Sequence, residues 1–207
     1  TSLKMNNKDN LTVTPITSML VDTFEEQGLE LTEENLNSVK TTVASKMGIY
    51  EQNIYEDFIE TNNSDLASKA LQFAHLFRVV KSLGIQNEKK IKKKLVSKIL
   101  ENGLETVSTD STTINSLITD IYDTFDSTNT NRTEITTNAV QIIKTVNENY
   151  KNSQNNLADL YKISKGYQNN NDVIKNGVID HIQSTENIST SIQNSINEIP
   201  IESIYKL

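Results

Sequence analysis

Turn-forming residues are scarce in this chain of 207 residues, which contains only six glycines and two prolines. An all-β fold of this length needs many tight turns, and glycine and proline supply most of them. Between the few breaks, apolar residues recur at intervals of three and four, the spacing that places them on one face of an α-helix. The sequence therefore predicts an all-α protein.

Five helices are predicted before residue 127, most of them starting at a Thr, Asn or Asp that can cap the free N–H groups of the first turn. We expect them over residues 14–28, 32–48, 63–84, 87–103 and 110–126. The third is the most apolar and should lie centrally in the core. Residues 49–63 lack a clean period and should form a structured connector with a short helical turn. Residues 14–127 are thus predicted to be a compact helical bundle.

A different pattern begins at residue 128. Apolar residues keep helical spacing over residues 135–150, 157–163 and 173–196, but they are sparse among many Asn, Ser and Thr residues. Helices of this kind are buried along one narrow stripe and need a covering partner. That partner can be the bundle, a second copy or a neighbouring protein, so residues 128–207 are expected to pack on the bundle or to extend from it. Residues 1–13 are expected to be an extended segment.

Composition and charge limit the classes of function. Hydrophobic residues make up 35% of the chain and aromatic residues 6%, which is little apolar material for a compact enzyme. A net charge of −7 repels phosphate backbones, so we expect no nucleic-acid partner. The chain has no cysteine, which removes disulfides and thiolate metal sites and suits a bacterial extracellular protein. No stretch approaches the roughly 20 apolar residues of a transmembrane helix, so the chain is not expected to span a membrane.

Few residues offer catalytic chemistry. The two histidines, His75 and His181, have no Cys, Asp or Glu at metal-ligand spacing, and the chain has no phosphate-binding loop or nucleophile motif. His75 lies beside the apolar stripe of the third predicted helix, where a packed histidine is more common than a catalytic one, and His181 is expected at the surface. An enzyme would need a pocket that joins His75 to a distant carboxylate such as Glu56 or Asp57. We therefore predict a protein without enzymatic activity or cofactor.

A basic run is the most conspicuous charge feature, and it comprises Lys89, Lys90, Lys92, Lys93, Lys94 and Lys98. Because Ile91 and Leu95 interrupt it at core spacing, we expect the run to be the solvated face of the fourth helix. The alternative is a docking face of Lys89, Lys90, Lys93 and Lys94 for lipid headgroups, polyanionic polysaccharide or an acidic neighbour. Binding of that kind would be salt-sensitive and weakly specific, since lysine is a flexible point charge.

Carboxylates gather in two places, at Glu56, Asp57 and Glu60 and at Asp120, Asp123 and Asp126. The second set has a spacing of three residues, which places it near one helix face where it can hold a calcium ion loosely. It lacks the glycine and the alternating ligands of a calcium-binding loop. We therefore expect solvent to relieve the repulsion between these carboxylates, and we predict no metal site.

Several short stretches resemble one recurrent module. They are residues 11–20 (LTVTPITSML), 44–49 (ASKMGI), 57–58 (DF), 67–74 (ASKALQFA) and 138–143 (NAVQII). Over residues 11–146 the chain is similar to the helical domain of large bacterial cell-surface, adhesin-like proteins. Ile16 and Met19 stand where that domain usually has leucine, and Asp57-Phe58 stands where it has Asp-Pro. The resemblance implies extracellular exposure and a structural or adhesive role, and it supplies no catalytic residues.

Two functions are therefore carried forward. The first is a non-catalytic structural or interaction module of a bacterial surface protein, with assembly of identical copies as one version and the C-terminal helices as the expected contact. The alternative is a ligand-sensing periplasmic helical bundle like that of a chemoreceptor. Flanking β-rich repeats or an export signal would favour the first, and flanking membrane helices would favour the second.

Overall fold

The computed structural model describes residues 14–126 and 128–170, together with scattered positions between 172 and 199. In this part of the chain there are eight α-helices, one short 3-10 helix and no strand. The α-helices are α1 (Pro15–Gln27), α2 (Glu33–Met47), α3 (Ser64–Lys81), α4 (Glu88–Asn102), α5 (Leu104–Thr109), α6 (Ser111–Phe125), α7 (Arg132–Asn152) and α8 (Leu157–Asn169). The prediction of an all-α protein is confirmed.

The finer helix count is only partly as predicted. Helices α1, α2, α3, α4 and α6 correspond to the five expected helices, and η1 (Glu51–Asn53) is the short turn expected in the connector. Helix α5 was not predicted, because its six residues are too few to show a period. The predicted extended segment 1–13 and most of the predicted helical stretch 173–196, including His181, lie outside the described residues.

Helix ends follow local capping chemistry. Thr14 accepts a hydrogen bond from the Thr17 N–H and begins α1, with Pro15 at its first position. Asn63 begins α3 and Asp110 begins α6 in the same way, each through a side-chain oxygen that accepts a backbone N–H. Such caps pair N–H groups that have no partner inside the helix. They explain why the ends of these helices could be predicted within a few residues.

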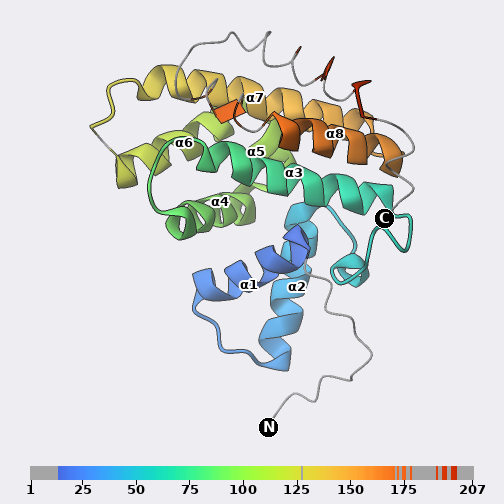
Figure 1. Ribbon diagram of the computed structural model, residues 1–207. Helices are drawn as coiled ribbons and strands as arrows, with labels where there is room; N and C mark the ends of the chain where they lie inside the picture. Colours follow the sequence, from blue (N-terminus) through green and yellow to red (C-terminus); the bar gives the residue numbers. More distant parts are fainter. Residues whose placement is uncertain are drawn as a thin grey trace.

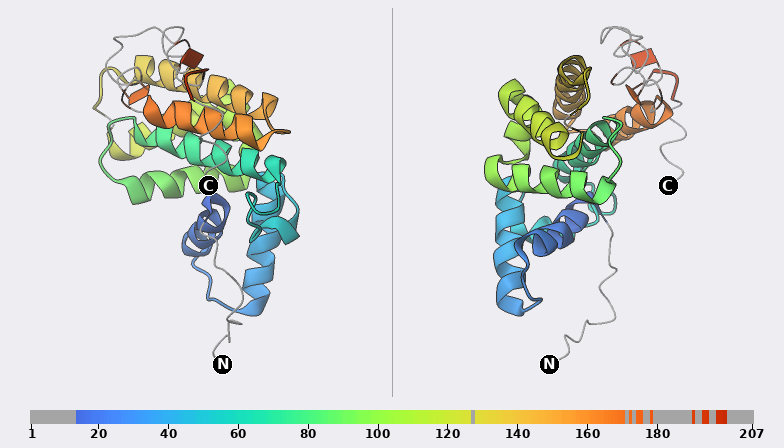
Figure 2. Two further views of the ribbon diagram at one scale, coloured as in Figure 1. Left: turned by 45° about the vertical axis from the view of Figure 1, so that its right-hand side comes forward. Right: turned by 90° about the vertical axis from the view of Figure 1, so that its left-hand side faces the viewer.

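Helix α3 lies at the centre, as its apolar sequence predicted. It packs against α7 and α8 on one side and against α1 and α4 on the other. Figure 1 shows α3 crossing the middle of the molecule between the layer of α7 and the pair of α1 and α2, and the turned views in Figure 2 keep this order. Ten of its residues are buried, which makes it the main scaffold for everything described below.

Helices α7 and α8 are covered by the bundle itself. Helix α7 packs along α3 and α6, and its apolar stripe of Ile135, Ala139, Ile142, Ile143, Val146 and Tyr150 is at most 3% exposed. Helix α8 also packs against α3 and buries Leu160 and Tyr167. Of the three covering partners left open by the sequence, the bundle is the one found for these two helices. Among the described residues, no helix has both the length and the apolar character needed to cross a bilayer.

Candidate functional site

His75 lies in the interior, on the side of α3 that faces α7 and α8. Its side chain is 3% exposed, and its ring lies 4.2 Å from the Tyr167 ring and 5.7 Å from the Tyr150 ring, centroid to centroid. The prediction of a packed histidine is therefore confirmed. The two tyrosines come from α8 and α7, so this aromatic cluster joins three helices.

Burial sets the protonation of the aromatic cluster. Desolvation lowers the pKa of His75 well below its ordinary value, and the nearby Arg78 charge lowers it further. Burial also raises the pKa of the Tyr150 and Tyr167 phenols above their ordinary value. All three rings are therefore neutral at pH 7. His75 does not meet Glu56 or Asp57, whose carboxylates accept hydrogen bonds within the connector from Thr61 and Asn63 and from the Ile59 and Glu60 amides.

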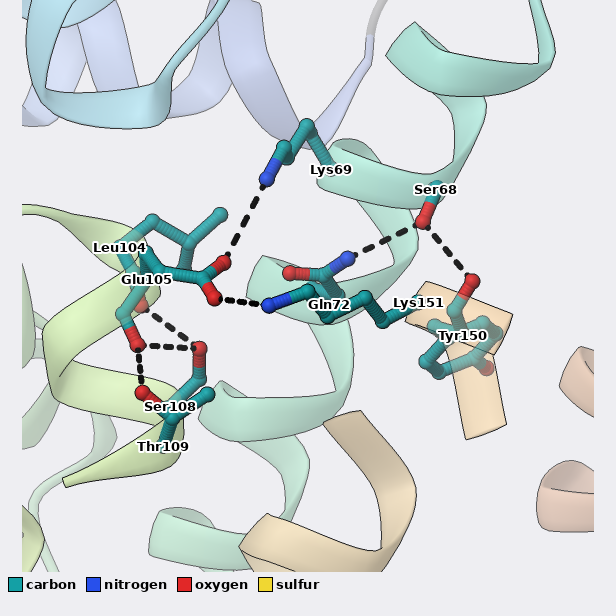
Figure 3. A network of polar contacts seen from close by, with 9 residues as sticks. All are labelled: Ser68, Lys69, Gln72, Leu104, Glu105, Ser108, Thr109, Tyr150 and Lys151. Atoms are coloured by element: carbon teal, nitrogen blue, oxygen red, sulfur yellow. Dashed lines mark hydrogen bonds and ion pairs between the residues drawn. The ribbon is translucent and has the colours of Figure 1, made fainter. Parts of the chain in front are cut away.

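A chain of buried hydrogen bonds ties α3 to α7 beside this cluster. The Gln72 Nε2 donates to Ser68 Oγ over 3.0 Å, and the Ser68 hydroxyl donates to the Tyr150 carbonyl over 3.1 Å. Both Ser68 and Gln72 are buried. Figure 3 shows the Gln72 amide with its nitrogen toward Ser68 and its oxygen pointing away. The donor role of Nε2 therefore fixes the orientation of the amide.

A carboxylate bridges three helices at the edge of the same interface. Glu105 of α5 forms ion pairs with Lys69 of α3 at 3.6 Å and with Lys151 of α7 at 2.5 Å (Figure 3). The hydrogen bond from Lys151 is the main cause that lowers the pKa of Glu105, and the charge of Lys69 adds to it. These groups are structural ties. In the part of the chain that the structure describes, no His, Asp and Glu side chains gather closely enough to hold a metal ion.

The predicted docking lysines lie on α4, and half of the basic run is neutralised by acidic neighbours. Lys89 pairs with Glu25 at 2.9 Å, Lys92 with Asp22 at 2.5 Å and Lys98 with Asp120 at 3.5 Å. The other three lysines, Lys90, Lys93 and Lys94, form no salt bridge with the described residues, and Lys90 and Lys94 are exposed. We call Lys90, Lys93 and Lys94 the α4 basic face. The sequence could not separate them from their neighbours, because the paired carboxylates lie in α1 and α6.

The three aspartates at positions 120, 123 and 126 each contact a different side chain. Asp120 pairs with Lys98, Asp123 pairs with Arg132 at 2.7 Å, and Asp126 accepts a hydrogen bond from Asn129 at 3.1 Å. Solvent was expected to relieve their repulsion. Asp120 and Asp123 are exposed to solvent, in line with that expectation, and each also pairs with a cation on another helix.

The connector between α2 and α3 presents apolar side chains to solvent. Tyr50 is 76% exposed, Ile59 is 59% exposed and Tyr55 is 46% exposed. Ile54, which lies between Tyr50 and Tyr55 in the sequence, is 1% exposed and anchors the connector in the core. Residues 49–65 contain five carboxylates, Glu51, Glu56, Asp57, Glu60 and Asp65, and no lysine or arginine. We call Tyr50, Tyr55, Ile59 and these carboxylates the connector surface.

Sequence reasoning noted three carboxylates of the connector, Glu56, Asp57 and Glu60, but did not predict which connector residues would be exposed. An irregular segment has no period, so the side that each residue faces cannot be read from spacing. The sequence feature that could have indicated this surface is the presence, within residues 49–65, of large apolar residues together with five carboxylates and no lysine or arginine. Two separate apolar residues are also exposed, Val21 in the middle of α1 at 56% and Leu31 in the α1–α2 turn at 66%.

No protein-family model matches the chain, and no curated protein or solved structure is significantly similar to it. Proposals about function therefore rest on the chemistry of the surfaces and of the interior.

Proposed function

We propose that this chain is a non-catalytic interaction module of a bacterial cell-surface protein and that it binds other proteins through the connector surface. The observation that carries the proposal is the exposure of Tyr50, Tyr55 and Ile59 within a uniformly acidic segment. The resemblance of residues 11–146 to helical domains of surface proteins supports an extracellular location.

Exposed tyrosines favour binding to another protein. A tyrosine ring offers a large contact area with few rotatable bonds, and tyrosine is enriched at the energetic centres of interfaces. The connector combines these apolar side chains with five carboxylates in the same segment, as an interface combines an apolar centre with polar neighbours. Lys40 of α2 lies over the Tyr55 ring, with its Nζ 5.3 Å from the ring centroid. The connector is also anchored to the core by Ile54, so the surface is presented by an ordered segment. A partner that fits it carries apolar side chains flanked by lysine or arginine.

The α4 basic face of the same chain carries the positive charge that such a partner needs, and it lies beyond the other end of α3. The connector precedes the first residue of α3 and α4 follows its last, and an 18-residue helix is about 27 Å long. Figure 1 shows the connector and the beginning of α4 at opposite ends of α3. The α4 basic face of one copy can therefore meet the connector surface of the next. Because the two surfaces differ, such a contact is head-to-tail and forms open chains or rings.

Charge reversal tests this form of assembly. One variant carries Glu51→Lys and Glu60→Lys, and a second carries Lys90→Glu and Lys94→Glu. In sedimentation velocity at low salt we expect the unaltered chain to associate, each variant alone to stay monomeric, and an equimolar mixture of the two to associate again. High salt should reverse the association, because the attraction is between exposed charges.

A variant with Glu30→Lys and Glu148→Lys changes the net charge by the same amount on other faces and should associate like the unaltered chain. A strict monomer under all conditions would contradict head-to-tail assembly. The wider proposal has a separate test, in which a photo-crosslinking residue replaces Tyr50 on living cells and a second one replaces Thr112 as the control. If position 50 gives no more crosslinked protein than position 112, the connector surface is not an interface.

A further inference from the structure

A small cavity lies in the interior, where α3, α5 and α7 meet. Its polar lining comes from Gln72 and His75 of α3, Ser108 of α5 and Asn147 of α7, and apolar side chains of α3 and α7 complete it. The centre of a water molecule has about 10 Å³ of space within it. Every residue that lines the cavity is buried.

Four polar atoms at this cavity lack a hydrogen-bond partner. They are Gln72 Oε1, His75 Nε2 and both the Oδ1 and Nδ2 of Asn147. Their side chains are only 2–3% exposed, so bulk water does not reach them. A buried polar atom without a partner costs more free energy than an ordinary hydrogen bond contributes, and buried groups of this kind are almost always paired. Four such atoms around one cavity indicate a bound molecule.

The geometry points to a buried water molecule, bound between α3 and α7 by Gln72, His75 and Asn147. The Gln72 amide is oriented by its bond to Ser68, so its Oε1 offers an acceptor. Asn147 offers both a donor and an acceptor, and neutral His75 offers one or the other at Nε2. A ligand for this set must both donate and accept hydrogen bonds. Water does so, and buried waters typically form about three hydrogen bonds.

Size and charge exclude other classes of ligand. The centre of a water-sized sphere has only about 10 Å³ in which to move, which is room for water and too little for an organic ligand. A metal ion is disfavoured because no carboxylate lines the cavity and the Asn147 Nδ2 is a donor. An apolar occupant would leave the four polar atoms unpaired. The water therefore acts as a structural link that supplements the Ser68 bond to the Tyr150 carbonyl.

High-resolution diffraction and solution NMR test this site on the intact chain. We expect one ordered water within hydrogen-bond distance of Gln72 and Asn147, and cross-relaxation between a long-lived water and the Asn147 side-chain amide. The variant Asn147→Leu should lose that water and its signal at the Gln72 amide. Asn152→Leu, the same substitution at an exposed position of α7, should retain both.

The measurement on the unaltered chain is decisive even if Asn147→Leu fails to fold. A cavity without density for water, together with the absence of a long-lived water signal in the folded chain, would overturn the inference. A direct hydrogen bond between Gln72 and Asn147 that fills the space would overturn it as well.

Discussion

At position 75, a histidine is held between two tyrosine rings and 3% exposed, and this burial keeps it neutral at pH 7. Its place beside an apolar stripe allowed the sequence to predict that it packs inside. The tyrosines around it could not be predicted, because Tyr150 and Tyr167 belong to helices far along the chain. Nothing in the sequence indicates that Gln72 and Asn147 line the same cavity as His75.

Mild acid should destabilise the protein through His75. The pKa of His75 is lowered on folding, so below the ordinary value of about 6.5 the unfolded chain binds a proton that the folded chain does not. Stability is then lost as the pH falls below that value, by on the order of 1 kcal/mol between pH 6.5 and 5.5. Urea unfolding across this range measures the effect.

Two substitutions test whether His75 causes this loss of stability in mild acid. His75→Phe should remove the dependence on pH between 6.5 and 5.5, because phenylalanine does not titrate. His181→Phe changes the other histidine of the chain and should leave it in place. Carboxylates with a lowered pKa, such as Glu105, act only at lower pH and do not enter this window. A slope unchanged by His75→Phe would show that another group is responsible.

The ends of individual helices are set by capping side chains and by glycines close to them in the sequence. Thr14, Asn63 and Asp110 cap helix starts, and Gly28 and Gly48 end α1 and α2 in the left-handed conformation. These features act within four residues, so the sequence could predict them. Helix α5 shows where this fails. Its apolar residues Leu104 and Val107 are fully buried, but two residues cannot establish a period.

Gly48→Ala tests how strongly a helix end depends on glycine. The φ angle of Gly48 is 70°, which strains a residue with a side chain, and an added Cβ would meet only the Lys69 Cε at 3.9 Å. The cost is therefore conformational, about 1 kcal/mol, and should lower the Tm by about 2–4 °C. Gly48→Asn should cost less, because asparagine tolerates this region. Equal Tm values for alanine and glycine would contradict the argument.

The molecule as a whole depends on the contact between α3 and α7. The sequence left open whether residues 128–207 complete the bundle or extend from it. In the structure α7 packs along α3, Ser68 bonds to the Tyr150 carbonyl, and Glu105 ties Lys69 to Lys151. Apolar surface of α3 is thus covered by α7, a helix for which the sequence left both arrangements open.

A chain that ends at residue 130 should therefore fail to fold cooperatively. Without α7 it exposes the apolar side of α3 and loses the six buried apolar side chains of α7 between Ile135 and Tyr150. Near-UV circular dichroism during urea unfolding should show no sharp transition for this fragment. Adding the separate fragment 131–207 should restore one. A sharp transition in the first fragment alone would mean that residues 14–127 fold independently.

The sequence by itself determined the all-α class, most helix ends, the central place of α3 and the burial of His75. These depend on spacing and capping, which act between residues close along the chain. Only the tertiary structure decided which lysines of α4 are paired, which connector residues are exposed and which polar side chains surround the cavity. Each of those depends on how helix faces from distant segments fit together. An apolar stripe in the sequence indicates that a helix face is buried, but it does not identify the segment that buries it.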